Sequence, residues 1–233
     1  MAPKRRTKNA VMTVMCDKTA KILVKKYSRL ENVKGDHLDI DYEKITMEKP
    51  ANLTNDDWLI VTLVDFLHRV ELLYSSCSLF CTSDTCPMFN AGPHYKYFWD
   101  DSDSPTPIQV SAPEYFSYLK RFIKRNLQDP NIIPGKSGEK LNEDALSTLK
   151  MCYRRLFRIL AHLYVCHFQN ISSIQEPNVV EIMNTILTHY TKFALAQGMI
   201  DLPDLEMLSP VFAAINKDSG NPLCPVYENV KSQ

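Results

Sequence analysis

The sequence lacks a long uninterrupted hydrophobic run. Its most apolar stretch extends from Trp58 to Tyr74, and charged or imidazole side chains break it at four positions. A helix that spans a membrane needs about 20 consecutive, predominantly apolar residues. We therefore predict a buried or amphipathic helix here and no membrane span. The first eight residues carry four basic side chains and no apolar run, so we expect no secretory signal either.

The sequence also has no excess of charge of one sign, because 27 lysines and arginines balance 27 aspartates and glutamates. Proteins that bind nucleic acid usually present a broad basic surface. The neutral balance therefore argues against a nucleic-acid partner. Any electrostatic role must come from charge that is segregated locally, not from the chain as a whole.

Two pairs of potential metal ligands stand far apart in the sequence. Cys81 and Cys86 have the spacing C-x₄-C, and His162 and His167 have the spacing H-x₄-H. Thiolate and imidazole are preferred donors of Zn²⁺, so the sequence predicts a tetrahedral Cys₂His₂ zinc site. Two thiolates cancel the charge of the ion, and four protein ligands leave no open position for a substrate. We therefore interpret the zinc as structural.

Motifs of enzymes that use zinc or nucleotides are incomplete or missing. Zinc hydrolases and deaminases need a carboxylate base beside the metal, as in H-E-x-x-H or H-x-E, but Leu163 and Tyr164 follow His162. Gly135-Lys136-Ser137 resembles the end of a phosphate-binding loop, yet position 130, where that loop needs its first glycine, is proline. We predict that the protein is not an enzyme, with a zinc-dependent hydrolase or deaminase as the alternative.

The pattern of apolar and turn-forming residues predicts a mainly α protein, a helical bundle with a small β-hairpin that is pinned by the metal. Residues 1–50 are polar and mixed, and we expect a variable, partly disordered N-terminal segment there. Residues 51–216 form the helical domain, and residues 217–233 form a C-terminal tail.

Local signals place the elements of the bundle. Ser111 and Glu114 form a capping box, which marks the start of a helix. The hairpin is expected to pair residues 95–99 with residues 108–110. The expected helices run from Asp56 or Asp57 to Tyr74, from Pro113 to Leu127, from Glu143 to Phe168, from Pro177 to Ala196, and for a short stretch after Pro203.

The predicted helix from Glu143 to Phe168 has two chemically distinct sides. Its apolar residues recur at alternating spacings of four and three, which puts them in one stripe. Arg154, Arg155 and Arg158 fall opposite that stripe, and no acidic residue lies within four positions of them. The three arginines are either a solvated face or an anion site, because guanidinium groups bind phosphate through two parallel hydrogen bonds. On a neutral protein, such an anion site points to a phosphorylated peptide.

The same helical wheel raises a question about the metal ligands. His167 lies in line with the apolar stripe, whereas His162 points about 140° away from it. An ideal helix would not direct both imidazoles at one ion. Cys166 lies four residues after His162, on the same side of an ideal helix, and could more easily reach the same ion. Either Cys166 is the fourth ligand, or the helix ends or widens between the two histidines.

Several short motifs follow one another along the chain. The cysteine segment reads FCTSDTCPMFNAGPHYKYFW from Phe80 to Trp99, and SAPEY follows it at residues 111–115. The long helix carries RLFR at residues 155–158, AHLY at residues 161–164, and then HF. In this order the motifs resemble the Mob kinase-activator family from about Trp58 to Ile200. Their Cys-Pro and Ala-Gly-Pro pattern is closer to the branch that coactivates NDR and LATS kinases than to the phocein branch.

The resemblance implies a helical bundle with a structural Zn²⁺. Carried across to this chain, the ligands are Cys81, Cys86, His162 and His167. The resemblance thus favours His167 over Cys166 as the fourth ligand, and it implies a distorted helix end near the histidines.

The resemblance also implies partners. Family members are not enzymes; they bind the N-terminal regulatory region of NDR and LATS kinases, which belong to the AGC class, and raise their activity. They also dock phosphorylated upstream kinases or scaffolds. The resemblance further implies a cytoplasmic protein, with the nucleus and spindle poles as additional locations. The residues that match the phosphothreonine-binding positions are Arg154, Arg155 and Arg158. The residues that match the acidic kinase-binding surface are Asp57, Trp58 and Asp65, while Leu53 stands where the family has a glutamate.

Overall fold

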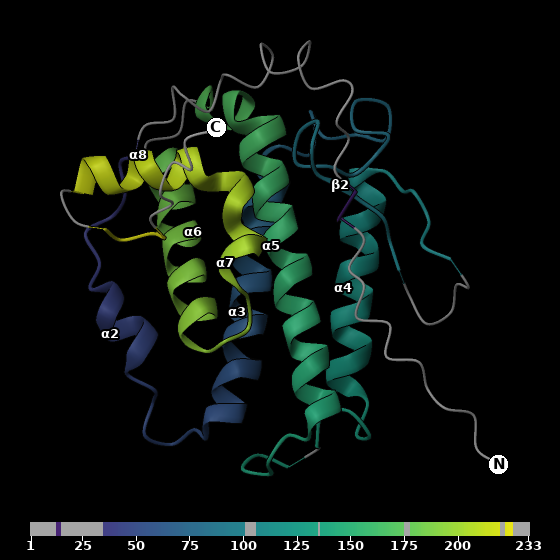
Figure 1. Ribbon diagram of the computed structural model, residues 1–233, viewed down its shortest axis with the longest axis vertical. Helices are drawn as coiled ribbons and strands as arrows, with labels where there is room; N and C mark the ends of the chain where they lie inside the picture. The colour runs from purple at the N-terminus through teal and green to yellow at the C-terminus, as the bar shows by residue number, and fades with distance from the viewer. Residues whose placement is uncertain are drawn as a thin grey trace, which may run out of the picture.

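The computed structural model describes residues 13–14, 35–100, 106–134, 136–174, 178–219 and 222–225. Its long helices stand side by side as a bundle, and α8 lies across one end of it (Figure 1). This architecture confirms the predicted mainly α fold. No helix in the described ranges is long and apolar enough to cross a membrane. The elements are β1 (Thr13–Val14), α2 (Tyr42–Met47), α3 (Asn55–Ser76), β2 (Lys96–Tyr97), α4 (Ala112–Gln128), α5 (Glu143–Ser172), α6 (Val179–Ala196), α7 (Leu202–Leu205), the 3₁₀ turn η2 (Glu206–Leu208) and α8 (Ser209–Ser219).

Side chains at the helix starts explain where the long helices begin. Thr54 caps α3 and Asn142 caps α5, each by accepting a hydrogen bond from a backbone N–H of the first turn. Ser111 and Glu114 form the predicted capping box at the start of α4. Such caps satisfy N–H groups that have no partner within the helix. The predicted starts of these helices are therefore confirmed to within two residues.

The central helix of the bundle is α5, which packs against α3, α4 and α6. Its predicted apolar stripe is fully buried, and Tyr153 within the stripe donates a hydrogen bond to the carbonyl of Leu59 on α3. Tyr190 on α6 donates in turn to the carbonyl of Tyr153. The opposite side of α5 is also largely buried between residues 152 and 164, so this helix has no broad solvated face there.

The predicted hairpin is reduced to a single bridge. Trp99 and Ile108 exchange two backbone hydrogen bonds of 2.8 Å. The carbonyl of Val110, however, accepts from the N–H of Phe89 at 2.9 Å, and the N–H of Tyr97 donates to the carbonyl of Phe89 at 3.0 Å. Phe89, in the segment that carries the cysteines, thus forms backbone hydrogen bonds with both strands of the predicted hairpin. Those backbone groups were expected to pair with each other. Strand β2 pairs with β1 instead.

Residues 35–50 contain a helix that the sequence did not predict. This helix, α2, packs against α6. The segment before it is tied to α6 as well, because the N–H of Leu38 donates to Thr185 Oγ1 at 2.9 Å and Asn184 Nδ2 donates to the carbonyl of Asp36 at 2.7 Å. The rest of the predicted N-terminal segment, apart from β1, lies outside the described residues.

His189 on α6 is a buried histidine whose charge depends on the fold. It is 7% exposed, and its ring centroid lies 4.9 Å from that of Phe66. Burial lowers its pKa to about 4; the Arg69 cation acts in the same direction, and Asp65 and a backbone hydrogen bond to Ile45 oppose it. The folded protein therefore keeps His189 neutral at pH values where the unfolded chain protonates it.

Acidification should destabilise the fold through His189. Because the folded pKa lies below the unfolded value of about 6.5, the unfolded state takes up the proton first, and stability falls as the pH drops from about 6.5 towards 4. Between about pH 7.5 and pH 5, we expect the wild type to lose about 2 kcal/mol more unfolding free energy than His189→Phe. Urea unfolding at both pH values measures the loss of unfolding free energy in each protein. Other groups that titrate in this range affect both proteins equally and cancel in the difference. Equal losses in the two proteins would contradict it.

Candidate metal centre and arginine cluster

The cysteine loop, residues 77–93, is attached to two helices by backbone hydrogen bonds. The N–H of Cys77 donates to the carbonyl of Tyr74 in α3 at 3.1 Å, and the N–H of Cys81 donates to the carbonyl of Cys77 at 2.9 Å. The carbonyl of Cys86 accepts from the N–H of Ala112, the first residue of α4, at 3.0 Å. Both predicted cysteine ligands are consequently held at buried positions.

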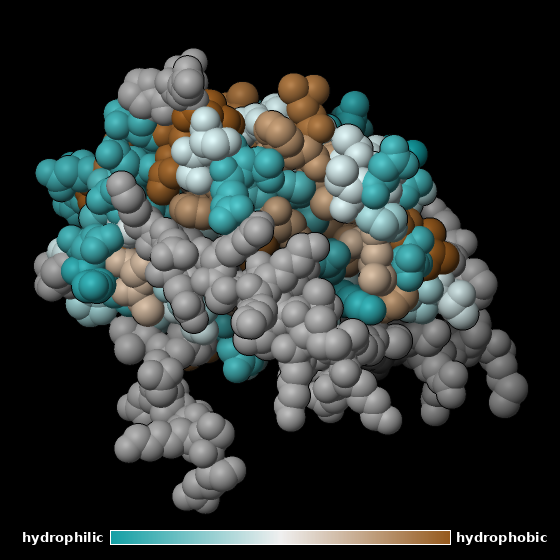
Figure 2. Space-filling model, turned by 90° about the horizontal axis from the view of Figure 1, so that it is seen from above, coloured by the Kyte–Doolittle hydropathy of each residue, from teal (hydrophilic) through white to brown (hydrophobic). Residues whose placement is uncertain are grey.

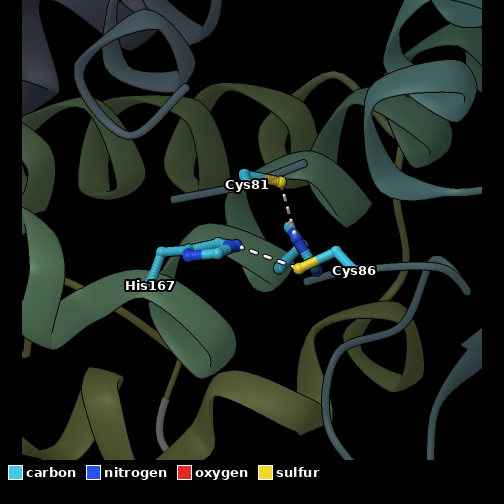
Figure 3. Close-up of side chains that lie close together, drawn as sticks. Cys81, Cys86 and His167 are labelled. Carbon is cyan, nitrogen blue, oxygen red and sulfur yellow. Dashed lines mark hydrogen bonds between the residues drawn. The ribbon is translucent and has the colours of Figure 1, made fainter. Parts of the chain in front are cut away.

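Helix α5 supplies the two predicted histidine ligands, and both are buried. His162 Nε2 lies 3.4 Å from Cys81 Sγ, and His167 Nε2 lies 3.4 Å from Cys86 Sγ. Figure 3 shows the His167 ring and the Cys86 sulfur pointing toward one another. All four ligand atoms lie within 4.8 Å of one another. The structure therefore brings together the four predicted residues in one cluster that could hold a metal ion.

Of the two alternatives derived from the helical wheel, the structure contradicts a helix that ends or widens, and the four-residue cluster does not include Cys166. Helix α5 is continuous to Ser172, so it neither ends nor widens between the histidines, and the implied distorted helix end is absent from this part of the chain. Cys166 is directed at Asn90 instead, with its Sγ 3.5 Å from Asn90 Oδ1. The wheel failed because it describes only where each side chain leaves the helix. The imidazoles reach well beyond that point, and the ring centroids of His162 and His167 converge to 4.9 Å.

The geometry suits a tetrahedral ion with sulfur and nitrogen ligands. With metal–sulfur bonds of about 2.3 Å and metal–nitrogen bonds of about 2.0 Å, a tetrahedron has sulfur–nitrogen edges of about 3.5 Å. The two observed sulfur–nitrogen distances of 3.4 Å match this edge. His162 Nδ1 also donates to the carbonyl of Asn90 at 2.7 Å, which directs the other ring nitrogen at the cluster. The residues present therefore fit a metal.

The cluster stabilises one thiol in its deprotonated form. Hydrogen bonds with Cys81 and with both imidazoles lower the pKa of Cys86 well below its usual range. Burial disfavours the charged form of His162, but hydrogen bonds with Cys166, Cys86 and Asn90 raise its pKa to about 10. Both shifts favour a thiolate at Cys86 and a protonated ring at His162, whereas metal binding requires the neutral imidazole.

The three predicted arginines do not share one exposed patch. Arg154 faces α7, where its Nε donates to Asp204 Oδ2 at 2.9 Å and its Nη2 donates to Asp201 Oδ2 at 2.5 Å. Its side chain is 31% exposed. The two carboxylates belong to the capping box of α7 and lie far along the chain from Arg154. Because Asp201 and Asp204 are almost 50 residues from Arg154 or more, the sequence around Arg154 does not reveal them.

Arg155 and Arg158 are buried against aromatic rings. The Arg155 guanidinium lies 4.4 Å from the ring centroid of Trp99 and 4.6 Å from that of Phe122, and it donates to the carbonyl of Asp100. Arg158 lies 4.8 Å from the ring centroid of Tyr97, and its Nη1 donates to the hydroxyl of Tyr115 at 3.1 Å. The rings fix the orientation of both guanidinium groups. The solvated face is therefore wrong for Arg155 and Arg158.

Comparison with known sequences decides the family. A sequence model of the Mob1/phocein family matches residues 39–208. The chain belongs to the Mob1/phocein family. It is 38% identical over 167 residues to "MOB kinase activator-like 1A" of Arabidopsis thaliana, covering 71% of this chain and 76% of that protein. It is 34% identical over 176 residues to "MOB kinase activator-like 1 homolog A" of Dictyostelium discoideum, covering 75% and 81%.

In this Mob1/phocein chain, the three predicted kinase-contact residues have different environments. Asp57 Oδ2 accepts hydrogen bonds from Thr54, Ser137 and the N–H of Gly138, and these bonds lower the pKa of Asp57. Trp58 is buried. Its ring centroid lies 5.0 Å from that of Phe193 on α6. Asp57 and Trp58 therefore hold α3 to its neighbours.

Asp65, the third residue of the predicted set, is half-exposed. Its side chain is 46% exposed, and its Oδ2 lies 2.8 Å from Arg69 Nη2. Val61 and Leu72 on the same helix are 53% and 73% exposed. Residues 61, 65, 68 and 72 follow one line along a helix surface, and His68 between them is also exposed. Sequence reasoning missed the two apolar members of this α3 stripe, because Val and Leu in an apolar helix normally indicate its buried side.

A groove of about 620 Å³ lies beside the metal cluster, between the cysteine loop and the C-terminal part of α5. Cys86 and His167, two of the four clustered side chains, form part of its wall. Figure 2 views the molecule from the end of the bundle that carries the cysteine loop and shows hydrophobic areas between hydrophilic ones. Leu79 and Phe80 contribute to the groove and are 87% and 44% exposed.

Proposed function

We propose that this protein is a non-catalytic kinase coactivator that binds the N-terminal regulatory region of an NDR- or LATS-type kinase of the AGC class. Membership of the Mob1/phocein family carries the proposal, because relatives in a plant and an amoeba are named MOB kinase activators. The metal cluster supports the non-catalytic role: four protein donors complete a tetrahedral site and leave no position for a substrate.

The ion proposed for the cluster is Zn²⁺, and its role is structural. Two thiolates and two imidazoles are a donor set that zinc prefers, and the thiolates balance its charge. When bound, the ion would link the cysteine loop to α5. Asn90 would then orient His162 through the hydrogen bond from Nδ1.

The α3 stripe is the proposed contact for the kinase segment. Its apolar ends, Val61 and Leu72, enclose the carboxylate of Asp65. An amphipathic basic helix fits this pattern, because its apolar side chains can pack on the ends of the stripe while a cation pairs with the carboxylate. Asp57 and Trp58 act indirectly, by fixing the position of α3.

Charge reversal in the stripe tests the proposal. We expect Asp65→Lys to weaken binding of a labelled NDR-type N-terminal segment by at least about tenfold, because a basic segment would meet a cation instead of a carboxylate. Fluorescence anisotropy measures the affinity, and circular dichroism verifies the fold. Glu139→Lys, an equal charge change in an exposed loop, is the matched control. Equal affinity of Asp65→Lys and Glu139→Lys would refute the proposed contact.

A phosphorylated upstream kinase or scaffold is the proposed second partner, bound at the arginine cluster formed by Arg154, Arg155 and Arg158. Buried guanidinium groups that are held by aromatic rings lose little freedom when they bind a phosphate, which favours such a site. Arg154 already pairs with the carboxylates of Asp201 and Asp204. An incoming phosphate would compete with these two carboxylates for the Arg154 guanidinium.

A further inference from the structure

Helix α4 carries a concentration of positive charge that the functions above do not use. Lys120, Arg121, Lys124 and Arg125 fall within six residues, and the one acidic residue of the helix, Glu114, belongs to its capping box. Because the whole chain is neutral, this is local segregation of charge. The helix stands beside α5 at one side of the bundle (Figure 1).

The basic residues divide into two groups. Lys120 turns toward α3, where its Nζ lies 2.7 Å from Glu71 Oε1. Arg121, Lys124 and Arg125 are exposed. Their spacing of three and four residues places them next to one another on one side of the helix. We call these three residues the α4 basic face.

Aromatic rings order the arginines of this face. The Arg121 guanidinium lies 4.8 Å from the ring centroid of Tyr118, and the Arg125 guanidinium lies 5.9 Å from that of Phe122. Both rings are half-buried and pack against Trp99, with centroid distances of 5.6 and 6.0 Å. The guanidinium of Arg121, stacked in this way, presents the N–H donors at its edge to a carboxylate. At Arg121 the face is therefore preorganised for planar anions as well as positively charged.

We propose that the α4 basic face binds an acidic segment of a protein partner, with several aspartates or glutamates close together. Carboxylates match guanidinium groups in geometry and charge. Two other polyanions fit less well. Nucleic acid calls for a wider basic field than three residues on a neutral protein. Binding to an anionic membrane would be favoured by only about 1 kcal/mol for each cation of the face. Helix α4 cannot insert into the membrane, because its apolar side is buried in the bundle.

This surface is independent of the proposed kinase contact. The α3 stripe has an exposed carboxylate and attracts a basic segment, whereas the α4 basic face repels one. A partner with a basic segment and an acidic segment would be bound in one orientation only. Failure of one contact would leave the other intact.

A labelled oligoglutamate peptide of about ten residues is the probe for this surface. We expect Arg121→Glu combined with Lys124→Glu to weaken its binding to the full chain by at least about tenfold, and the wild-type affinity to fall as salt is raised. Lys136→Glu combined with Lys140→Glu makes the same change in net charge at exposed loop positions and should bind within about twofold of the wild type. Fluorescence anisotropy reports the affinities, and thermal unfolding verifies that each variant is folded.

Two results would overturn the proposal. One is an equal loss of oligoglutamate binding in the two double variants, which would mean that only net charge matters. The other is tighter binding of duplex DNA or of phosphatidylserine vesicles than of oligoglutamate, lost on the same two substitutions in α4. That outcome would assign the face to a different class of partner.

Discussion

Removal of the metal should lower the free energy of unfolding by about 4 kcal/mol and loosen the cysteine loop where Cys81 and Cys86 face α5. The ion would join Cys86 to His162 across 75 intervening residues, and a link over so long a segment restricts the unfolded chain strongly. The link adds to the backbone hydrogen bonds of the loop and to its fully buried Phe89, whose ring packs against Tyr97 and Tyr115. Urea unfolding with and without a chelator measures the loss.

Cys166 provides the matched control for this prediction. We expect Cys81→Ser to lose bound zinc and to unfold at lower urea concentration, since it removes one of the four ligands. Cys166→Ser should keep one zinc ion per chain, because the Cys166 thiol is directed at Asn90. Metal analysis of the purified proteins gives the zinc content. Zinc retention in Cys81→Ser, or zinc loss in Cys166→Ser, would contradict the ligand assignment.

Arg158→Ala should destabilise the fold by about 2–4 kcal/mol, far more than Arg154→Ala. The Arg158 side chain is 8% exposed, so truncation leaves a cavity beside Tyr97 and leaves the hydroxyl of Tyr115 without its donor. Arg154 makes ion pairs near the surface, which contribute about 1 kcal/mol or less. Urea unfolding compares the variants, and similar small losses in both would contradict the buried role of Arg158.

The same cluster separates packing from phosphate binding. Arg158→Met keeps much of the side-chain volume but loses the charge, so it should fold better than Arg158→Ala and still lose affinity for a phosphothreonine peptide. Anisotropy with the phosphorylated peptide and its unphosphorylated form measures this. Undiminished affinity of folded Arg158→Met for the phosphorylated form would remove Arg158 from the proposed site.

The elements that the sequence predicted well are those determined locally. Helices α3, α4 and α5 begin at side-chain caps and carry apolar residues at helical spacing, and both features are visible in a short stretch of sequence. The clustering of Cys81, Cys86, His162 and His167 was predictable for a chemical reason, because a Cys pair and a His pair together suit few ions other than zinc.

The elements that were missed depend on contacts between distant segments. The hairpin shrank because Phe89 forms backbone hydrogen bonds with Val110 and Tyr97, which no local pattern reveals. The arginines were expected at the surface, but α4 and the aromatic segment before it cover Arg155 and Arg158. Helix α2 has only six residues, too few to show a clear helical period in the sequence. In the structure it packs against α6, a contact between segments that are distant in the sequence.

The pair of carboxylates on the capping box of α7 has a consequence for the kind of anion that the proposed arginine site could accept. Asp201 and Asp204 already give Arg154 two negatively charged ligands from within the same chain. An aspartate or glutamate from a partner has one negative charge and would gain nothing by exchanging with them. A phosphate group near neutral pH carries close to two charges on one atom centre and can compete. A peptide with aspartate or glutamate in place of phosphothreonine should therefore bind this site poorly. The protein would then distinguish a phosphorylated partner from an unphosphorylated acidic one.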